Sequence, residues 1–254
     1  MKKIFLCVSV LLAGQAQAQT CIPTPDCAGL GYTETSCSGA FLRCPFDTSK
    51  MFCASSAGGG SSSSGGGATP ESGGCLVGMI YYSDGSCSRS VDGSKTAIGV
   101  VVEDNAYVMS VPKTGTMTWA STSNDVSGLT NFYSDNQAKL DYLGKLNTAA
   151  IVAAYSSDTT INNAAKYCNS YSTAGTSAGQ WYLPAAGELY DGLYLNNKKV
   201  TRAFAQLGVV INGYFWSSSE YSSGDAWFVS SISDDVVNEN KYSYNRSVSC
   251  FLAL

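Results

Sequence analysis

Residues 180–189 read QWYLPAAGEL, and this stretch begins the central helical part of the sequence. Pro184 suits the first turn of a helix, because its fixed φ is helical and its missing N–H is not needed there. The sequence therefore predicts a helix that begins at Pro184. A second helix is expected before it, over 160–171, and a third after it, over 198–207, ending at Gly208.

Strands are expected on both sides of these helices. Short β-branched and aromatic runs bounded by turn residues are typical of strands. The expected strands are 76–82, 97–102, 105–111, the region of Trp119, 214–218, 226–232 and 247–254. Because strands come first, helices follow and strands close the chain, we expect an α+β fold.

Five segments with distinctive sequences occur in a fixed order. They are NTAAI (147–151), QWYLPAAGEL (180–189), FWSSSEY (215–221), DAW (225–227) and VSCFLAL (248–254). Together they resemble the bacterial Lcl C-terminal domain family, which has a C-type-lectin-like fold and shares it with the variable proteins of diversity-generating retroelements. The resemblance covers most of residues 75–254. It implies a disulfide between the first helix and the last strand, through Cys168 and Cys250.

Two groups of residues inside these motifs are assigned structural roles. Trp181, Trp216 and Trp227 are interpreted as framework core residues rather than ligand platforms. Glu188 is expected to satisfy nearby backbone groups or to cap a helix rather than to act in catalysis.

The first 18 residues have the features of an export signal. Lys2 and Lys3 precede an apolar run about half as long as the ~20 residues of a membrane-spanning helix. Ala16 and Ala18 then form a small-x-small cleavage site. We therefore expect residues 1–18 to be a signal peptide, and the mature protein to be extracellular, at the cell surface or in the periplasm, with no transmembrane span.

The rest of the chain divides into three parts. Residues 19–53 hold five cysteines and are too few to fold without disulfides. Residues 54–74 form a Gly/Ser-rich flexible linker, and 75–254 form the C-type-lectin-like domain. Export favours disulfides, so we expect Cys75 and Cys87 to be bonded as well. Nine cysteines remain after cleavage, and the odd one allows an intermolecular disulfide through the Cys-rich unit.

Composition excludes several functions. The 254 residues contain no His, which excludes Ser-His-Asp catalysis and His-ligated metals. The net charge is −4, and removal of the two signal-peptide lysines gives 13 − 19 = −6. Such a chain lacks the basic stripe of nucleic-acid-binding proteins. We expect no cofactor. Asp234, Asp235 and Glu239 supply oxygens that suit calcium, although their spacing alone defines no site.

Residues 214–249 have an unusual composition: 21 of these 36 residues are Ser, Tyr, Asn or Asp. The same mixture forms antibody paratopes, where Tyr supplies rigid contact area and the small polar residues supply hydrogen bonds. It is also the composition of an ordinary solvated surface. Trp227 and Val229 are expected to face the core. Phe228 lies between them, and successive side chains of a strand point to opposite faces, so Phe228 is expected to point outward as an apolar anchor. The candidate ligand-binding residues are Tyr221, Ser222, Asp225, Phe228, Asp235, Asn238, Asn240, Tyr242, Ser243, Tyr244 and Asn245.

The sequence thus predicts a secreted or surface-displayed, adhesin-like binding protein that is not an enzyme. Its partner would be a protein or glycan on another cell, a phage or a host, and a retroelement would diversify the binding face. Two alternatives stay open. One is a structural surface or fimbrial subunit without a specific ligand, and the other is an oxidase like the formylglycine-generating enzymes, which share the fold. A glycosaminoglycan ligand is disfavoured, because residues 214–254 hold two basic residues against five acidic ones.

Overall fold

The structure is a computed structural model that describes residues 19–21, 35–37, 41–44, 47–53, 74–157 and 163–254. The chain divides into two compact units, Met1–Thr69 and Pro70–Leu254. In the first unit, β1 (Gln19–Cys21) pairs with β2 (Thr35–Cys37), and β3 (Phe41–Cys44) pairs with β4 (Asp47–Cys53), both antiparallel. The expected signal peptide, the linker up to residue 73 and the cysteine side chains of the Cys-rich unit lie outside the described residues.

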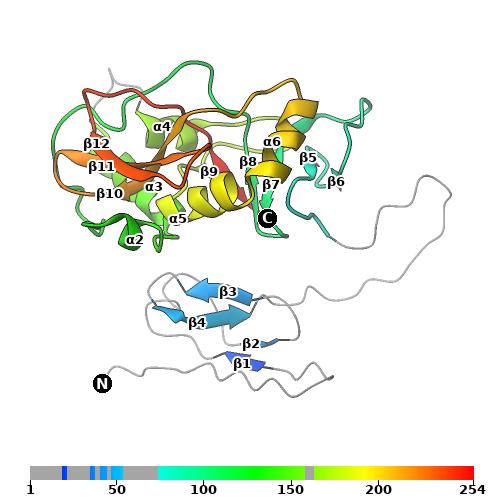
Figure 1. Ribbon diagram of the computed structural model, residues 1–254, viewed down its shortest axis with the longest axis horizontal. Helices are drawn as coiled ribbons and strands as arrows, with labels where there is room; N and C mark the ends of the chain where they lie inside the picture. The colour runs from blue at the N-terminus through cyan, green and yellow to red at the C-terminus, as the bar shows by residue number, and fades with distance from the viewer. Residues whose placement is uncertain (1–18, 22–34, 38–40, 45–46, 54–73, 158–162) are drawn as a thin grey trace. The chain divides into compact units, whose positions relative to one another are not determined.

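The described part of the second unit is built on two antiparallel sheets and several short helices, so it is an α+β fold (Figure 1). The six-stranded sheet has the order β6-β5-β7-β8-β13-β9 and the three-stranded sheet the order β10-β11-β12. The strands are β5 (Ile80–Tyr82), β6 (Cys87–Ser88), β7 (Ala97–Glu103), β8 (Tyr107–Met109), β9 (Trp181–Tyr182), β10 (Tyr214–Glu220), β11 (Asp225–Ser230), β12 (Val236–Asn240) and β13 (Phe251–Ala253).

The helices lie between β8 and β10 in the sequence. They are α2 (Asp135–Ala138), α3 (Gly144–Ala154), α4 (Ala164–Ser170), α5 (Ala186–Leu189), the π-helix η1 (Tyr190–Leu195) and α6 (Asn197–Gln206). The helix expected from Pro184 begins two residues later as α5 and continues through η1 into α6. In α4 the N-cap is Asn163, whose Oδ1 accepts the N–H of Lys166 at 2.8 Å. The strand expected at Trp119 is not formed, and the neighbouring Met117 makes only an isolated bridge to Arg246.

Two apolar clusters cover opposite faces of the sheets. Cluster 1 contains Ile151 of α3, Cys168 of α4, Trp119, Trp181, Trp216 and Phe228. Cluster 2 contains Leu189, Leu193, Val200, Phe204, Trp227 and Phe251. Strands β7, β11 and β13 each contribute neighbouring residues to both clusters, which is why their sequences are apolar at successive positions. The three tryptophans assigned to the framework are all buried.

Two disulfides fix the second unit. Cys168 of α4 is bonded to Cys250, next to β13, which is the pair that the resemblance implies. Cys75 is bonded to Cys87 of β6. The first of these closes a separation of 82 residues and the second a separation of 12. The longer bridge joins the helical part to the last strand and so constrains the unfolded chain more.

Candidate functional site

The loop 242–245 is separated from the end of β12 by Lys241 alone, and all four of its residues are exposed. The side chain of Asn240 fixes its beginning, because Oδ1 accepts the N–H groups of Tyr242 at 3.2 Å and Ser243 at 3.0 Å. Tyr242 and Tyr244 are each 47% exposed. The loop therefore presents two phenol rings on a backbone that Asn240 holds in a defined turn. Asn240, Tyr242, Ser243, Tyr244 and Asn245 were all expected at a binding face, and they are adjacent in the structure.

Lys241 anchors this loop from below. Its side chain is completely buried, and the ammonium group donates to the carbonyl oxygens of Asn124 at 3.0 Å and Ser223 at 3.1 Å and to a carboxylate oxygen of Glu220. It also lies 4.7 Å from the ring centroid of Trp119. Burial raises the pKa of Glu220 and lowers the pKa of Lys241, so desolvation outweighs the attraction within the pair.

Arg246 follows the loop and forms the centre of an aromatic cluster. Its guanidinium carbon lies 4.8 Å from the ring centroid of Phe228 and 5.6 Å from those of Tyr214 and Tyr244. One guanidinium nitrogen pairs with Glu239 of β12. The Nε of Arg246 is buried and has no hydrogen-bond partner among the described residues. We call Tyr214, Phe228, Glu239, Tyr244 and Arg246 the arginine cluster.

The expectation that Phe228 points outward is wrong. Phe228 is only 4% exposed and belongs to cluster 1, while its neighbours Trp227 and Val229 belong to cluster 2. The expectation assumed that only one face of β11 is covered. In the structure the rings of Trp216 and Tyr214 pack edge-on against the ring of Phe228, with centroid distances of 5.9 and 5.3 Å. Phe228 therefore supports the surface from beneath and is not exposed for contact with a partner.

Tyr221, Ser222 and Asp225 form the turn between β10 and β11. The carbonyl of Asp225 accepts the N–H groups of Tyr221 and Ser222 at 3.1 Å, and Ser222 Oγ accepts the N–H of Asp225 at 3.2 Å. Asp225 is paired with Asn240 in the sheet register, so this turn lies at the same end of the sheet as the exposed loop. Tyr221 is half-buried. Its ring lies edge-on to the rings of Trp227 and Tyr133, with centroid distances of 5.5 and 5.9 Å.

Asp235 lies at the other end of the sheet, in the β11–β12 turn. Its carbonyl accepts the N–H of Ser230 at 2.9 Å. At about 3.4 Å per residue, the five steps from Asp235 to Asn240 place Asp235 roughly 17 Å from the beginning of the loop. Asn238 lies between the two ends, half-buried on β12. The structure thus brings together most of the predicted residues and leaves Asp235 apart.

Two of the three acidic residues named for calcium, Asp234 and Glu239, are paired with basic side chains. The hydroxyl of Tyr190 and the ammonium of Lys139 lower the pKa of Asp234, and Lys139 Nζ lies 2.9 Å from Asp234 Oδ1. Glu239 is paired with Arg246. Within residues 74–157 and 163–254, no three His, Cys, Asp or Glu side chains gather in a way that could hold a metal ion.

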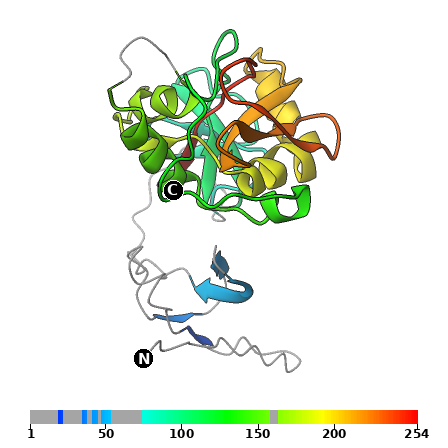
Figure 2. The ribbon, with the colours of Figure 1, turned by 90° about the vertical axis from the view of Figure 1, so that its left-hand side faces the viewer.

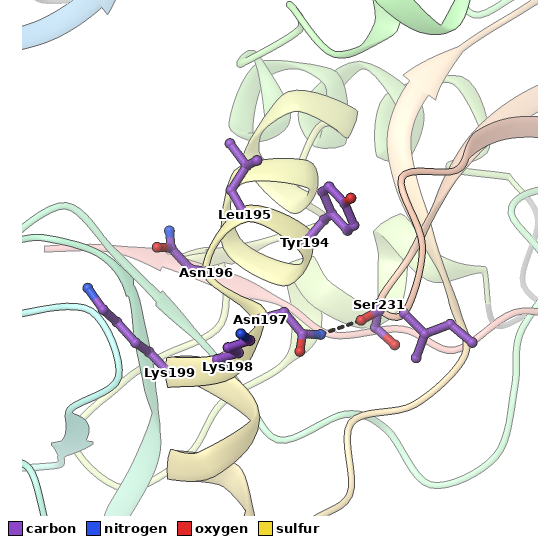
Figure 3. Close-up of a pocket in the computed structure, with 8 residues that line it drawn as sticks. Tyr194, Leu195, Asn196, Asn197, Lys198, Lys199 and Ser231 are labelled. Carbon is purple, nitrogen blue, oxygen red and sulfur yellow. Dashed lines mark hydrogen bonds between the residues drawn. The ribbon is translucent and has the colours of Figure 1, made fainter.

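Two surface hollows lie outside the predicted face. One of about 540 Å³ is lined by Tyr194 to Lys199, Ser231 and Ile232 (Figure 3). Its side chains do not converge: Asn196 and Lys199 point to one side of the helix, while Tyr194 and Asn197 point to the other, where the Asn197 amide donates to the Ser231 carbonyl. The second hollow, of about 260 Å³, is lined in part by Glu103, Glu188 and Asp191.

Glu188 has the structural role that was expected of it. Its Oε2 accepts the N–H of Ala185 at the beginning of α5 at 2.7 Å, and its Oε1 accepts the hydroxyl of Tyr182 at 3.2 Å. The carboxyl group is buried, and this burial raises its pKa well above the ordinary value. Asp141 is a second buried acid, which accepts hydrogen bonds from Ser219, Asn147 and the N–H of Leu143.

Sequence reasoning missed the residues that shape the candidate face from below, namely Lys241, Glu220, Arg246 and Tyr214. Lys241 and Arg246 were counted only as the two basic residues of the segment 214–254. In the structure Lys241 pairs with Glu220, 21 positions earlier in the sequence, and Arg246 contacts Tyr214, 32 positions earlier. We find no local signal that could have revealed them.

Comparison of the sequence with known protein families gives no match, and comparison with curated proteins also gives none. Among the helices that the structure describes, none is long and apolar enough to cross a bilayer. A crystal structure of a fimbrial protein from Bacteroides ovatus is similar in fold, with a TM-score of 0.55 and 18% sequence identity. The similar region covers 70% of this chain and 49% of that protein, so the chain matches about half of its length. At this identity, the likeness shows a shared fold.

Proposed function

We propose that the protein is exported and displayed at the cell surface, where its C-terminal domain, of C-type-lectin-like fold, binds a partner in an adhesin-like role. The observation that carries this proposal is the Tyr242–Asn245 loop. Two half-exposed tyrosines stand on a turn that Asn240 fixes, above a buried lysine and beside the arginine cluster. A rigid aromatic loop loses little entropy on binding, which favours recognition.

The test compares binding by matched variants of the full-length mature protein. Tyr242→Ala with Tyr244→Ala removes the two exposed rings. Leu195→Ala with Val210→Ala removes exposed apolar surface elsewhere, since those side chains are 61% and 83% exposed. Fluorescently labelled proteins are added to intact bacterial and epithelial cells. We expect only the tyrosine variant to lose binding, by at least about tenfold, without a change in melting temperature. Binding that is unchanged in the tyrosine variant would refute the proposal.

A structural fimbrial subunit is the second candidate, and the fold shared with a fimbrial protein favours it. In that role the domain would enter a surface assembly and its exposed loop would be dispensable. Surface material sheared from cells that express the tyrosine variant distinguishes the two. Retained assembly together with lost cell binding supports the binding role, whereas retained assembly with unchanged cell binding supports the structural role.

A further inference from the structure

The connection between α6 and β10 contains Asn212–Gly213, the single Asn-Gly pair of the sequence. In Figure 2 the connection from α6 (gold) to β10 (orange) runs along the margin of the C-terminal unit. Ile211 is buried just before the pair, whereas Asn212 itself is exposed. Among the described residues, no hydrogen bond holds the Asn212 side chain. The amide group can therefore turn toward the backbone that follows it.

Gly213 leaves its backbone nitrogen accessible to this amide. Its N–H has no acceptor among the described residues, whereas its carbonyl accepts the N–H of Ser231 at 2.9 Å and the Ser231 hydroxyl at 3.1 Å. The φ of Gly213 is +113°, and a Cβ built on it would meet no atom within 4 Å. The space beside the backbone is thus open, and glycine places no side chain in it.

These features permit a reaction between the two residues. The Gly213 nitrogen, after losing its proton to hydroxide or water, attacks the side-chain carbonyl carbon of Asn212, and the amide nitrogen leaves as ammonia. Water then opens the resulting cyclic imide at either of its carbonyl carbons. One opening gives aspartate, and the other gives isoaspartate, in which the main chain runs through the former side chain. The reaction consumes a water and releases an ammonia, with no oxidation or reduction.

Asn169 is the other described asparagine that precedes a small residue without a branched side chain, and its surroundings differ. Asn169 and Ser170 form the end of α4, so their backbone is helical. The Asn169 carbonyl also accepts the N–H of Gly179 at 2.7 Å. The Ser170 nitrogen can attack the Asn169 side chain only when the last turn of α4 opens, which costs free energy. Folding should therefore protect Asn169 and leave Asn212 reactive.

We propose that Asn212 is a site of spontaneous deamidation in the native protein, where water converts it into a mixture of aspartate and isoaspartate. Both products add a negative charge two residues before Tyr214 of the arginine cluster. The isoaspartate form also lengthens the main chain by one carbon just before β10. The reaction therefore alters the border of the candidate binding surface without an enzyme. This inference is independent of the proposed function, because it concerns the covalent state of the chain.

The experiment incubates the full-length mature protein, either native or unfolded in guanidinium chloride, and follows each asparagine by mass spectrometry after reduction and tryptic digestion. Asn212 lies in the tryptic peptide 203–241, and electron-transfer fragmentation separates aspartate from isoaspartate. We expect Asn212 of the native protein to react within about threefold of its rate in the unfolded chain, and folding to slow Asn169 by at least about tenfold. The rate at Asn212 should rise with pH, because the attacking nitrogen must lose its proton.

Asn212→Gln is the matched control. Its amide stays exposed, but the longer side chain must close a larger and less favourable ring. The acidic species that grows on anion exchange of the wild type should therefore form at least about tenfold more slowly in this variant. Three results would overturn the proposal. They are protection of Asn212 on folding equal to that of Asn169, an acidic species that grows equally in Asn212→Gln, and conversion to aspartate without isoaspartate, which would indicate direct hydrolysis of the amide.

Discussion

Lys241→Met isolates the buried ion pair beneath the candidate binding loop. Met has a similar shape and no charge, so the change removes the ammonium and little of the packing. The carbonyl oxygens of Asn124 and Ser223 lose their donor, at a cost of about 1 kcal/mol each. Glu220 is left buried without a cation, which costs about 2 kcal/mol more. We expect the free energy of unfolding to fall by about 4 kcal/mol at pH 7.

The pH dependence of this loss follows from Glu220. Without Lys241 the buried carboxyl favours its protonated form even more than it does in the wild type, where burial already raises its pKa. The folded variant then holds a proton that the unfolded chain releases near the ordinary value of 4.5. The difference in the free energy of unfolding between the wild type and Lys241→Met should therefore be smallest below pH 4.5. It should grow as the pH rises through the folded-state pKa of Glu220.

Urea unfolding followed by tryptophan fluorescence measures both effects, because Trp119 lies directly against the lysine. Glu220→Gln combined with Lys241→Met is the matched control, since it removes the unpaired charge and should recover about 2 kcal/mol. A Lys241→Met protein within about 1 kcal/mol of the wild type would refute the reasoning. A double variant less stable than the single one would also refute it.

Local patterns predicted much of the fold. The stretch 160–171, expected to be helical, contains α4, the run 97–102 lies within β7, and Gly208 follows α6 with φ +73°. Each depends on a periodicity or a cap that a few neighbouring residues determine. β12 was not predicted, because VVNEN carries polar residues at a sheet edge and looks like the turns around it.

The predicted part of the candidate site consists mostly of its exposed and half-buried polar residues. The loop Tyr242–Asn245 follows from composition, since Tyr, Ser and Asn seldom fill a core. Phe228 was misplaced because alternation predicts an exposed face only when one side of a strand is covered, and clusters 1 and 2 cover both sides of β11. The burial of Lys241 was not predicted, because lysine is almost never fully buried unless paired and its partner Glu220 is on another strand.

Two further predictions concern the disulfides and the buried acid of α5. Cys168→Ser with Cys250→Ser should lower the free energy of unfolding by about 4–5 kcal/mol, and Cys75→Ser with Cys87→Ser should lower it by about 3 kcal/mol. The first loss is larger because loop entropy grows with loop length, and the two bridges close separations of 82 and 12 residues. A larger loss for the Cys75 and Cys87 variant in urea unfolding would contradict this. Glu188→Gln keeps the acceptor for the Ala185 N–H and removes the titrating group. Burial raises the folded-state pKa of Glu188, so the wild type binds a proton on folding. Its free energy of unfolding therefore falls by about 1.4 kcal/mol for each pH unit between the unfolded-state and folded-state pKa values. The Gln variant should lack that decline as the pH rises above 4.5, while the contribution of Asp141 stays common to both proteins. Parallel stability curves for the two proteins over this range would show that Glu188 is ionised in the folded state, held by Tyr182 and the Ala185 N–H alone.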